Sequence, residues 1–282
     1  MSRRSNTVLN SYCIARIRFA VLIFSILALA TACRAVEPTA AAVAGFNSYI
    51  STLESRIARQ HQSQNGFIAS VLSDQNNRAK LQRGEPIIER ISSGTSPELP
   101  GATIYHWRGT AFVPGAKVAD FERLMEDFAN YPKSFAPQIV QAKVMSRKDE
   151  GGRVSIQTAM RVKQHHVITV VMDMAYDAEF ARLDAQHGYS ISRSTRITEI
   201  SGAGTKDEHA MSGSEQHGFL WRLDSYWSYE ERDGGLYMQI ESVSLTRSIP
   251  AGLGWALGPF VQSVPRESLE FTLQSASKAL KK

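Results

Sequence analysis

The chain has 282 residues, of which 43% are hydrophobic and 21% are charged, a composition typical of a globular protein and not of a disordered one. Its formal net charge of +5 comes mainly from the N-terminal leader, which holds four arginines and no acidic residue before Cys33, so the rest of the chain is close to neutral. Nucleic-acid binding depends on a lasting basic patch, and we therefore expect no nucleic-acid partner.

The leader contains one apolar run, from Phe19 to Ala30. As a helix this run spans about 18 Å, which is short against a bilayer core of about 30 Å. With its basic flank and the small residues that follow, the run predicts a signal peptide over residues 1–35. The alternative is an N-terminal membrane anchor that is not cleaved.

Two cleavage points fit the residues after the run. A cut after Ala32 leaves Cys33 as the first residue, which resembles a bacterial lipobox in which that cysteine is acylated, although Ala30 stands where leucine is usual. A cut after Ala35 gives an ordinary exported protein. We expect a protein of the periplasm or cell envelope, with a possible membrane tether through lipidation of Cys33.

The only cysteines are Cys13 and Cys33. Both lie in the leader region, so the mature domain has no intramolecular disulfide, no thiolate metal site and no cysteine nucleophile.

Residues 36–99 are expected to form a tether and a helical extension. Phe46, Ile50, Leu53 and Ile57 recur at helical spacing, and a second helical stretch is expected near Phe67 to Leu72. Two readings stay open for this segment: a helical layer on the main domain, or a helical hairpin that binds a partner protein.

From residue 100 the pattern changes to strands. A β-rich segment over 103–113 is followed by a short amphipathic helix over 118–128. Further strands are expected over 139–146, 154–162, 166–176 and 189–200, and a loop over 201–217.

A hairpin turn at Asp233-Gly234-Gly235 joins the last two strands. In the first of them, alternation predicts one buried face and one solvated face. The buried face holds Phe219, Trp221, Leu223, Ser225, Trp227 and Tyr229. The chain closes with a helix that we expect to start near Ser263, with a buried stripe at Leu269, Leu273, Ala276 and Leu280.

This order of elements, over about 100–282, resembles the START and polyketide cyclase superfamily, also called SRPBCC or Bet v 1-like. The most specific segments are 121–132 (FERLMEDFANYP) and 244–250 (SLTRSIP). The chain also looks like exported bacterial members of unknown function. The resemblance implies an α+β helix-grip fold, in which a curved antiparallel sheet wraps a long C-terminal helix around a hydrophobic cavity. It implies a hydrophobic small molecule or lipid as ligand.

Five residues are candidates for ligand binding. Trp221, Trp227 and Tyr229 line either a ligand cavity or the ordinary core. Arg193 and Glu241 are expected to orient the polar end of a ligand, or to form a structural ion pair, because an unpaired buried charge is costly.

No catalytic residue can be named. The chain lacks the nucleophile elbow, the zinc-protease motif and both phosphate-binding glycine motifs. His165 and His166 are adjacent on a strand and point to opposite faces, so we expect no metal, and no cofactor either. The expected function is an exported binding or carrier protein for a hydrophobic ligand. The alternatives are a cyclase- or hydrolase-type enzyme of the same fold and an envelope protein-interaction module.

Overall fold

The computed structural model describes the following residues, with the backbone alone for Ser70 and residues 254–262: 37–63, 66–68, 70–91, 99–165, 169–249 and 254–281. The expected signal peptide, with Cys33, lies outside the described residues. Among the helices of these ranges, none is long and apolar enough to cross a membrane.

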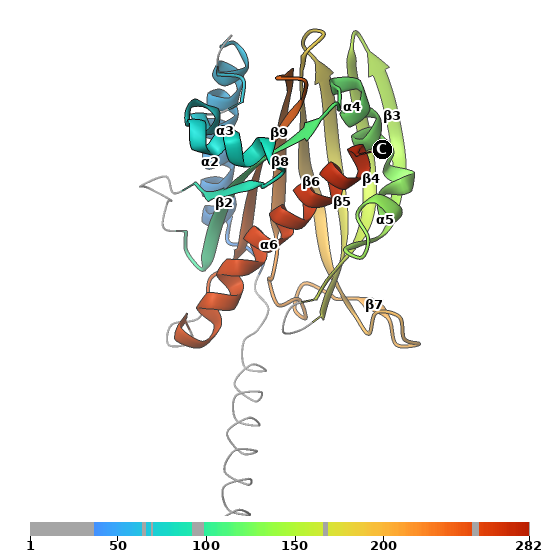
Figure 1. Ribbon diagram of the computed structural model, residues 1–282. Helices are drawn as coiled ribbons and strands as arrows, with labels where there is room; N and C mark the ends of the chain where they lie inside the picture. Colours follow the sequence, from blue (N-terminus) through green and yellow to red (C-terminus); the bar gives the residue numbers. More distant parts are fainter. Residues whose placement is uncertain are drawn as a thin grey trace, which may run out of the picture.

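One antiparallel sheet organises the molecule (Figure 1). Its strand order is β1-β2-β9-β8-β6-β5-β4-β3, and the short β7 pairs with β6. The strands are β1 Ile87–Arg90, β2 Ala102–Pro114, β3 Ile139–Glu150, β4 Arg153–His165, β5 Thr169–Arg182, β6 His187–Ser201, β7 His209–Ala210, β8 Arg222–Arg232 and β9 Gly235–Arg247.

Helices cover both faces of this sheet. The long C-terminal helix α6 runs diagonally across one face, which we call the inner face, and α4 and α5 lie on the same side (Figure 1). Helix α2 packs on the opposite, outer face. The helices are α2 Ala40–His61, η1 Ser70–Ser73, α3 Gln75–Gln82, α4 Val118–Glu126, η2 Phe128–Asn130, α5 Tyr131–Ser134 and α6 Gly254–Leu280.

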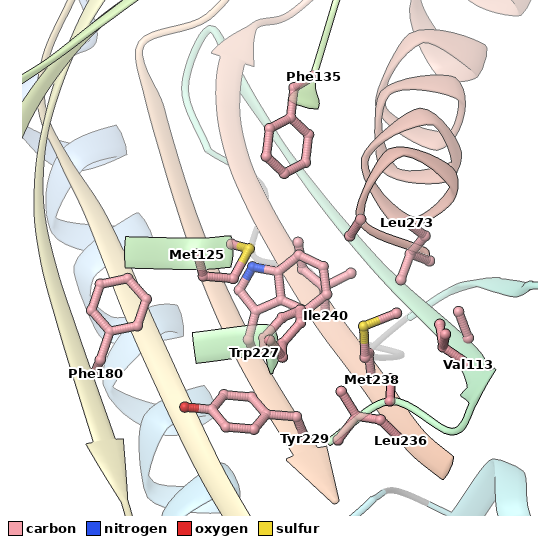
Figure 2. Close-up of a cluster of buried hydrophobic side chains, with 14 of the residues drawn as sticks. Val113, Met125, Phe135, Phe180, Trp227, Tyr229, Leu236, Met238, Ile240 and Leu273 are labelled. Atoms are coloured by element: carbon pink, nitrogen blue, oxygen red, sulfur yellow. The ribbon is translucent and has the colours of Figure 1, made fainter. Parts of the chain in front are cut away.

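The inner core lies where α4 and the C-terminal half of α6 meet the sheet. The Phe121 ring of α4 contacts Trp227 and Tyr229 of β8. Met125 of α4 and Leu273 of α6 belong to the same buried cluster (Figure 2). Each large apolar side chain buried in this way contributes about 1.5–3 kcal/mol to the free energy of unfolding. This end of the inner face is filled with side chains.

The outer face of β8 is buried, so the prediction that one face of this strand is solvated was wrong. Phe46, Ile50 and Leu53 of α2 are buried against outer-face residues that include Val243 and Leu245. The sheet is therefore covered on both sides at β2, β9 and β8. The alternation along the strand was predicted correctly, but the polar residues of the outer face are covered by α2 instead of being exposed to water.

Three element boundaries differ from those expected. Residues 36–45 were expected to be a tether, but α2 begins at Ala40, where the Thr39 hydroxyl accepts a hydrogen bond from Ala42 N at 3.1 Å. Within the expected helical extension, Ile87–Arg90 is an edge strand. Helix α6 starts at Gly254, well before the expected start near Ser263. The later start was predicted because glycine and proline have low helix propensity, yet the segment that contains them is helical. The α+β class, with a curved antiparallel sheet and a long C-terminal helix, is confirmed.

Candidate functional site on the inner face

Near the middle of the inner face, four cross-strand neighbours form a row. Trp107 of β2 lies opposite Ser242 of β9, Ser242 lies opposite Ser225 of β8, and Ser225 lies opposite Ser192 of β6. We call these four residues the inner row. All four are partly exposed, whereas Trp227, one row nearer to α4, is buried.

The inner row is unusual for a face that lies under a helix. Three of its members are serines, whose small side chains leave space where large apolar residues would fill it. Within the part of the chain that the structure describes, no protein group hydrogen-bonds the hydroxyls of Ser192, Ser225 or Ser242. The side chains of this row are therefore reached by solvent, and the three serines keep hydroxyls without a protein partner among the described residues.

Trp107 adds the sharpest feature of the row. Its indole Nε1 is buried, and no group of the described residues accepts a hydrogen bond from it. A buried donor without an acceptor costs about 1–3 kcal/mol, so native structures rarely keep one without a reason. The atom is closed to solvent, so an acceptor could reach this N–H only if the ring or its neighbours shifted.

Apolar side chains continue the inner face beyond the row. Met172, Met174 and Tyr176 of β5 are buried together, and Met160 and Val162 of β4 pack against them. We call these five residues the methionine wall. Methionine side chains are flexible and polarisable, which suits them to contacts with apolar surfaces of varied shape. Burial raises the pKa of the Tyr176 hydroxyl, which therefore stays neutral and donates to Met174 Sδ.

The three predicted aromatic residues do not form one surface. Trp227 and Tyr229 lie on the inner face in the packed core, where Phe121 contacts both rings (Figure 2). Trp221 lies just before β8 begins and packs on the outer core with Tyr226. The strand's alternation breaks at its start, and this break separates Trp221 from the other two.

Arg193 and Glu241 also lie on the outer face and do not meet each other. Arg193 pairs with Glu54 of α2 at 2.6 Å. Glu241 accepts hydrogen bonds from Arg56 of α2, from His106 Nε2 at 2.8 Å and from Arg108 Nη2 at 3.2 Å. The structure therefore shows two separate ion-pair clusters that hold α2 on the sheet, and neither residue lies on the inner face with the inner row.

The charge of Glu241 is balanced by its neighbours, although the Nε of Arg108 is buried and has no hydrogen-bond partner among the described residues. Burial alone would raise the pKa of Glu241, but the hydrogen bonds from His106 and Arg56 and the charge of Arg108 lower it to about 2. His106 Nδ1 in turn pairs with the Tyr49 hydroxyl at 2.8 Å. The order tyrosine, histidine, carboxylate is that of a proton relay, but His106 and Glu241 are buried between α2 and the sheet. We interpret the cluster as a clamp.

A serine–histidine pair on the outer face is also covered by neighbouring side chains. His61 Nε2 lies 2.7 Å from Ser228 Oγ, and burial lowers the pKa of His61 to about 4, with a further effect of Arg56. The His61 ring stacks between Phe67 and Tyr189. Because Ser228 is buried and the imidazole is covered on both faces, this pair has no room for a substrate.

Asp224 marks the point where β6 and β8 stop pairing. Its carboxylate accepts a hydrogen bond from Ser194 N at 3.1 Å, and burial raises its pKa to about 6 in spite of that bond. A bulge in β6 lies beside it. Past the bulge, Ile197 packs with the methionine wall, while Arg193 before it faces α2.

Among the described residues no group of three or more His, Cys, Asp and Glu side chains could hold a metal ion. His165 Nδ1 instead pairs with the Thr169 hydroxyl at 2.7 Å. His166 lies outside the described residues.

Sequence reasoning placed Ser225 on the aromatic face but gave it no role. The inner row was missed because its members are common residues on four separate strands, and only strand register brings them together. One signal was available: serines alternate at 190, 192 and 194, which is small-residue spacing on one face of a strand.

No family model matches the chain, and no curated protein matches it. Solved structures do match at low identity. A START superfamily protein from Mycobacterium smegmatis is 14% identical, with a TM-score of 0.41, over 62% of this chain and 97% of that one. A STAR-related lipid transfer protein from Xanthomonas axonopodis is 13% identical, with a TM-score of 0.39, over 69% of this chain and 99% of that one.

A third match is the Zhui aromatase/cyclase from Streptomyces, 12% identical with a TM-score of 0.39 over 63% of this chain and 94% of that one. These are proteins of the kinds that the sequence resembles, but identities and TM-scores this low concern the fold at most. The chain's own architecture, an antiparallel sheet with a long C-terminal helix across its inner face, gives it the α+β helix-grip fold.

Proposed function

We propose that this protein binds or carries a hydrophobic ligand, lipid-like or polyketide-like, between the inner face of the sheet and α6. The observation that carries the proposal is the buried indole N–H of Trp107, which has no acceptor among the described residues and lies in a row with partly exposed serines. Ligand sites are mostly apolar with a few polar groups that fix orientation, and this face has both parts.

The two parts of the face suggest how a ligand would lie. An apolar body would pack on the methionine wall, whose side chains adapt to different shapes. An oxygen acceptor would reach Trp107 Nε1, and the hydroxyls of Ser225 and Ser242 can donate to the same polar end or accept from it. A plain hydrocarbon would leave these groups unpaired, so the site favours a ligand with at least one oxygen.

The proposal also covers the cellular location and the protein superfamily. The leader supports export to the periplasm or cell envelope, with acylation of Cys33 as a tether, and the order of elements supports membership of the START and polyketide cyclase superfamily. A tethered carrier of this kind would collect its ligand at a membrane surface. The near-neutral charge of the chain after Cys33 is compatible with a ligand that is mainly apolar.

Native mass spectrometry of protein purified from its own host tests the function. We expect the intact protein to carry an additional small-molecule mass that is lost on denaturation. Trp107→Phe removes the N–H and keeps an apolar ring, so its bound fraction should fall about fivefold to tenfold, as for loss of one buried hydrogen bond.

Trp221→Phe is the matched control, because it makes the same chemical change on the outer face and should leave the bound fraction unchanged. If the parent protein carries no added mass, and none appears after incubation with lipid extract from the host, the proposed function is wrong. Equal bound fractions in both variants would remove Trp107 from the site.

A further inference from the structure

A second hollow lies outside the inner row, where the C-terminal half of α6 meets the turn between α3 and β1. It is a groove of about 220 Å³. Its floor is apolar and buried, formed by Ala111, Phe112 and Leu273. The walls and rim are Gly84, Pro86, Gln274, Ser277, Lys278 and Lys281.

Small residues keep the groove open. Gly84 has a positive φ of 83°, which a side chain would strain, and it forms one wall without a Cβ. Ala111 on β2 and Ser277 on α6 occupy positions where larger residues would fill the floor and the rim. The neighbouring Phe112 ring packs against Tyr237 instead of closing the space.

The rim of the groove is positively charged. Lys278 lies in the last turn of α6, and Lys281 follows the last helical residue, where its backbone N still donates to Ser277 O at 3.2 Å. This helical hydrogen bond keeps the two lysines, three residues apart, on the same side. The Lys281 ammonium lies 3.9 Å from the position that a Cβ would take at Gly84. No acidic residue lines the groove, and no carboxylate of the described residues pairs with either lysine. Glu85, close by in sequence, pairs with Arg83 at 2.9 Å.

We propose that this groove binds an amphiphilic anion, a single carboxylate on a short apolar chain, separately from the ligand of the inner row. The carboxylate would lie between the two ammonium groups, with Gln274 and Ser277 as further donors, and the chain would cover Ala111, Phe112 and Leu273. The volume is below the ~300 Å³ of typical drug-sized sites, which favours one short chain over a lipid with two acyl chains.

A structural role also accounts for lysines at this position, because cations near a helix C-terminus offset its dipole. That role needs no apolar floor and predicts no ligand. The test therefore uses isothermal titration of the purified protein with octanoate at low salt, compared with 1-octanol, which has the same chain length but no charge.

We expect octanoate to bind and octanol to bind at least about tenfold more weakly. Lys278→Gln/Lys281→Gln should weaken octanoate binding about fivefold to tenfold, as expected for two partly exposed ion pairs. Ser277→Leu should abolish binding by filling the rim. Lys148→Gln/Lys206→Gln makes the same change in net charge on distant exposed residues and should have no effect.

Trp107→Phe separates the two sites. Octanoate affinity that is unchanged in Trp107→Phe and lost in the groove variants supports the groove, whether or not the inner row binds a ligand. Equal affinity for octanol and octanoate, or full binding by the double-lysine variant, would overturn the groove proposal. Loss of binding in Trp107→Phe alone would assign octanoate to the inner row and overturn it as well.

Discussion

Single small residues decide where α6 touches the sheet and where it does not. A Cβ at Gly109 would overlap Leu273 of α6, and a Cβ at Gly188 would overlap the Tyr229 ring, so glycine at these two positions allows close packing. One row farther along the strands, serines at 192, 225 and 242 lie partly exposed. On these strands the inner face thus changes over a single row from buried residues to partly exposed ones.

Ser225→Val tests directly whether that space exists. The substitution adds apolar volume to the inner row, where the account places unfilled room. We expect the free energy of unfolding, from urea denaturation, to change by less than about 0.5 kcal/mol or to increase, because the added methyl groups meet no packed neighbour.

Ala178→Val is the control on the same face, because Ala178 lies opposite Ser192 and is buried in the inner core. Extra volume in a packed site costs about 1–3 kcal/mol, which we expect for Ala178→Val. A similar loss for Ser225→Val would mean that the interior beside the inner row is packed solid, and the carrier function would then be excluded.

His61 predicts a defined pH dependence of stability. Its pKa is about 4 in the folded protein, against 6.5 for an ordinary histidine. Below pH 6.5 the unfolded chain binds a proton at this histidine that the folded chain does not, so the contribution of His61 to the free energy of unfolding falls as the pH falls from 6.5 to about 4. Between pH 7 and pH 5 this loss is about 2 kcal/mol. Asp224, whose pKa is raised to about 6, contributes in the opposite direction over this range.

His61→Gln keeps a donor and acceptor for Ser228 but does not titrate. Urea denaturation at pH 7 and pH 5 should therefore show a loss about 2 kcal/mol smaller in this variant than in the parent. An identical loss in both proteins would contradict the buried, neutral His61.

At the scale of elements, α2 converts a two-layer helix-grip arrangement into three layers. Its apolar stripe packs on β2, β8 and β9. Its polar residues contact Glu241, Arg193 and Ser228 on the outer face. A polar outer face on the central strands would be ordinary if it were solvated. Here it is buried, and α2 supplies Arg56 as a partner for Glu241 and Glu54 as a partner for Arg193.

Glu241→Ala should detach this layer more than any other single change on the outer face. It leaves Arg56, Arg108 and His106 without their shared carboxylate, and loss of one partner of a buried ion pair costs about 3–5 kcal/mol. We expect that loss in urea denaturation, with faster hydrogen exchange over residues 40–61.

The matched control is Glu89→Ala, which removes a half-exposed carboxylate 3.8 Å from Arg108. Surface pairs contribute about 0–1 kcal/mol, so this variant should stay close to the parent. Unchanged exchange of residues 40–61 in Glu241→Ala would show that the apolar stripe alone holds α2.

The sequence predicted these elements better than their contacts. Alternation and helical spacing were enough for β2, α4, β4, β6 and the final hairpin, because each pattern is local. The predicted start of the last helix near Ser263 was wrong, because α6 begins at Gly254 in spite of the low helix propensity of the glycines and proline between them. The helical layer on the main domain was predicted and is seen in α2, but the strands that it covers were not, because nothing local shows that α2 lies against strands some 180 residues later.

At the scale of the whole molecule, the inner face has two halves with different tasks. The half under α4 and the C-terminal part of α6 is a packed core that gives stability. The other half combines the inner row with the methionine wall and carries the proposed ligand. The candidate residues chosen from the sequence, Trp227 and Tyr229, fall in the first half, and the row that faces the second emerges only from strand register.

Register explains why the site could be predicted only in part. The face of Ser225 followed from alternation along one strand, but its neighbours Ser242, Ser192 and Trp107 come from three others, separated by up to 135 positions in the chain. The bulge in β6 also puts Ile197 on the inner face and leaves Arg193 on the outer face, although plain alternation would place both on one face. Such offsets have no local signature in a single sequence.

The most direct measurement of the central claim is the indole N–H resonance of Trp107. The chain has four tryptophans, so a ¹⁵N–¹H spectrum holds four indole signals, and Trp107→Phe identifies the relevant one. When the co-purified ligand is removed and then added back, we predict that the Trp107 proton moves upfield and then returns downfield as it gains an acceptor, while Trp221 stays fixed. A Trp107 signal that is identical in the empty and loaded protein would contradict a ligand at the inner row.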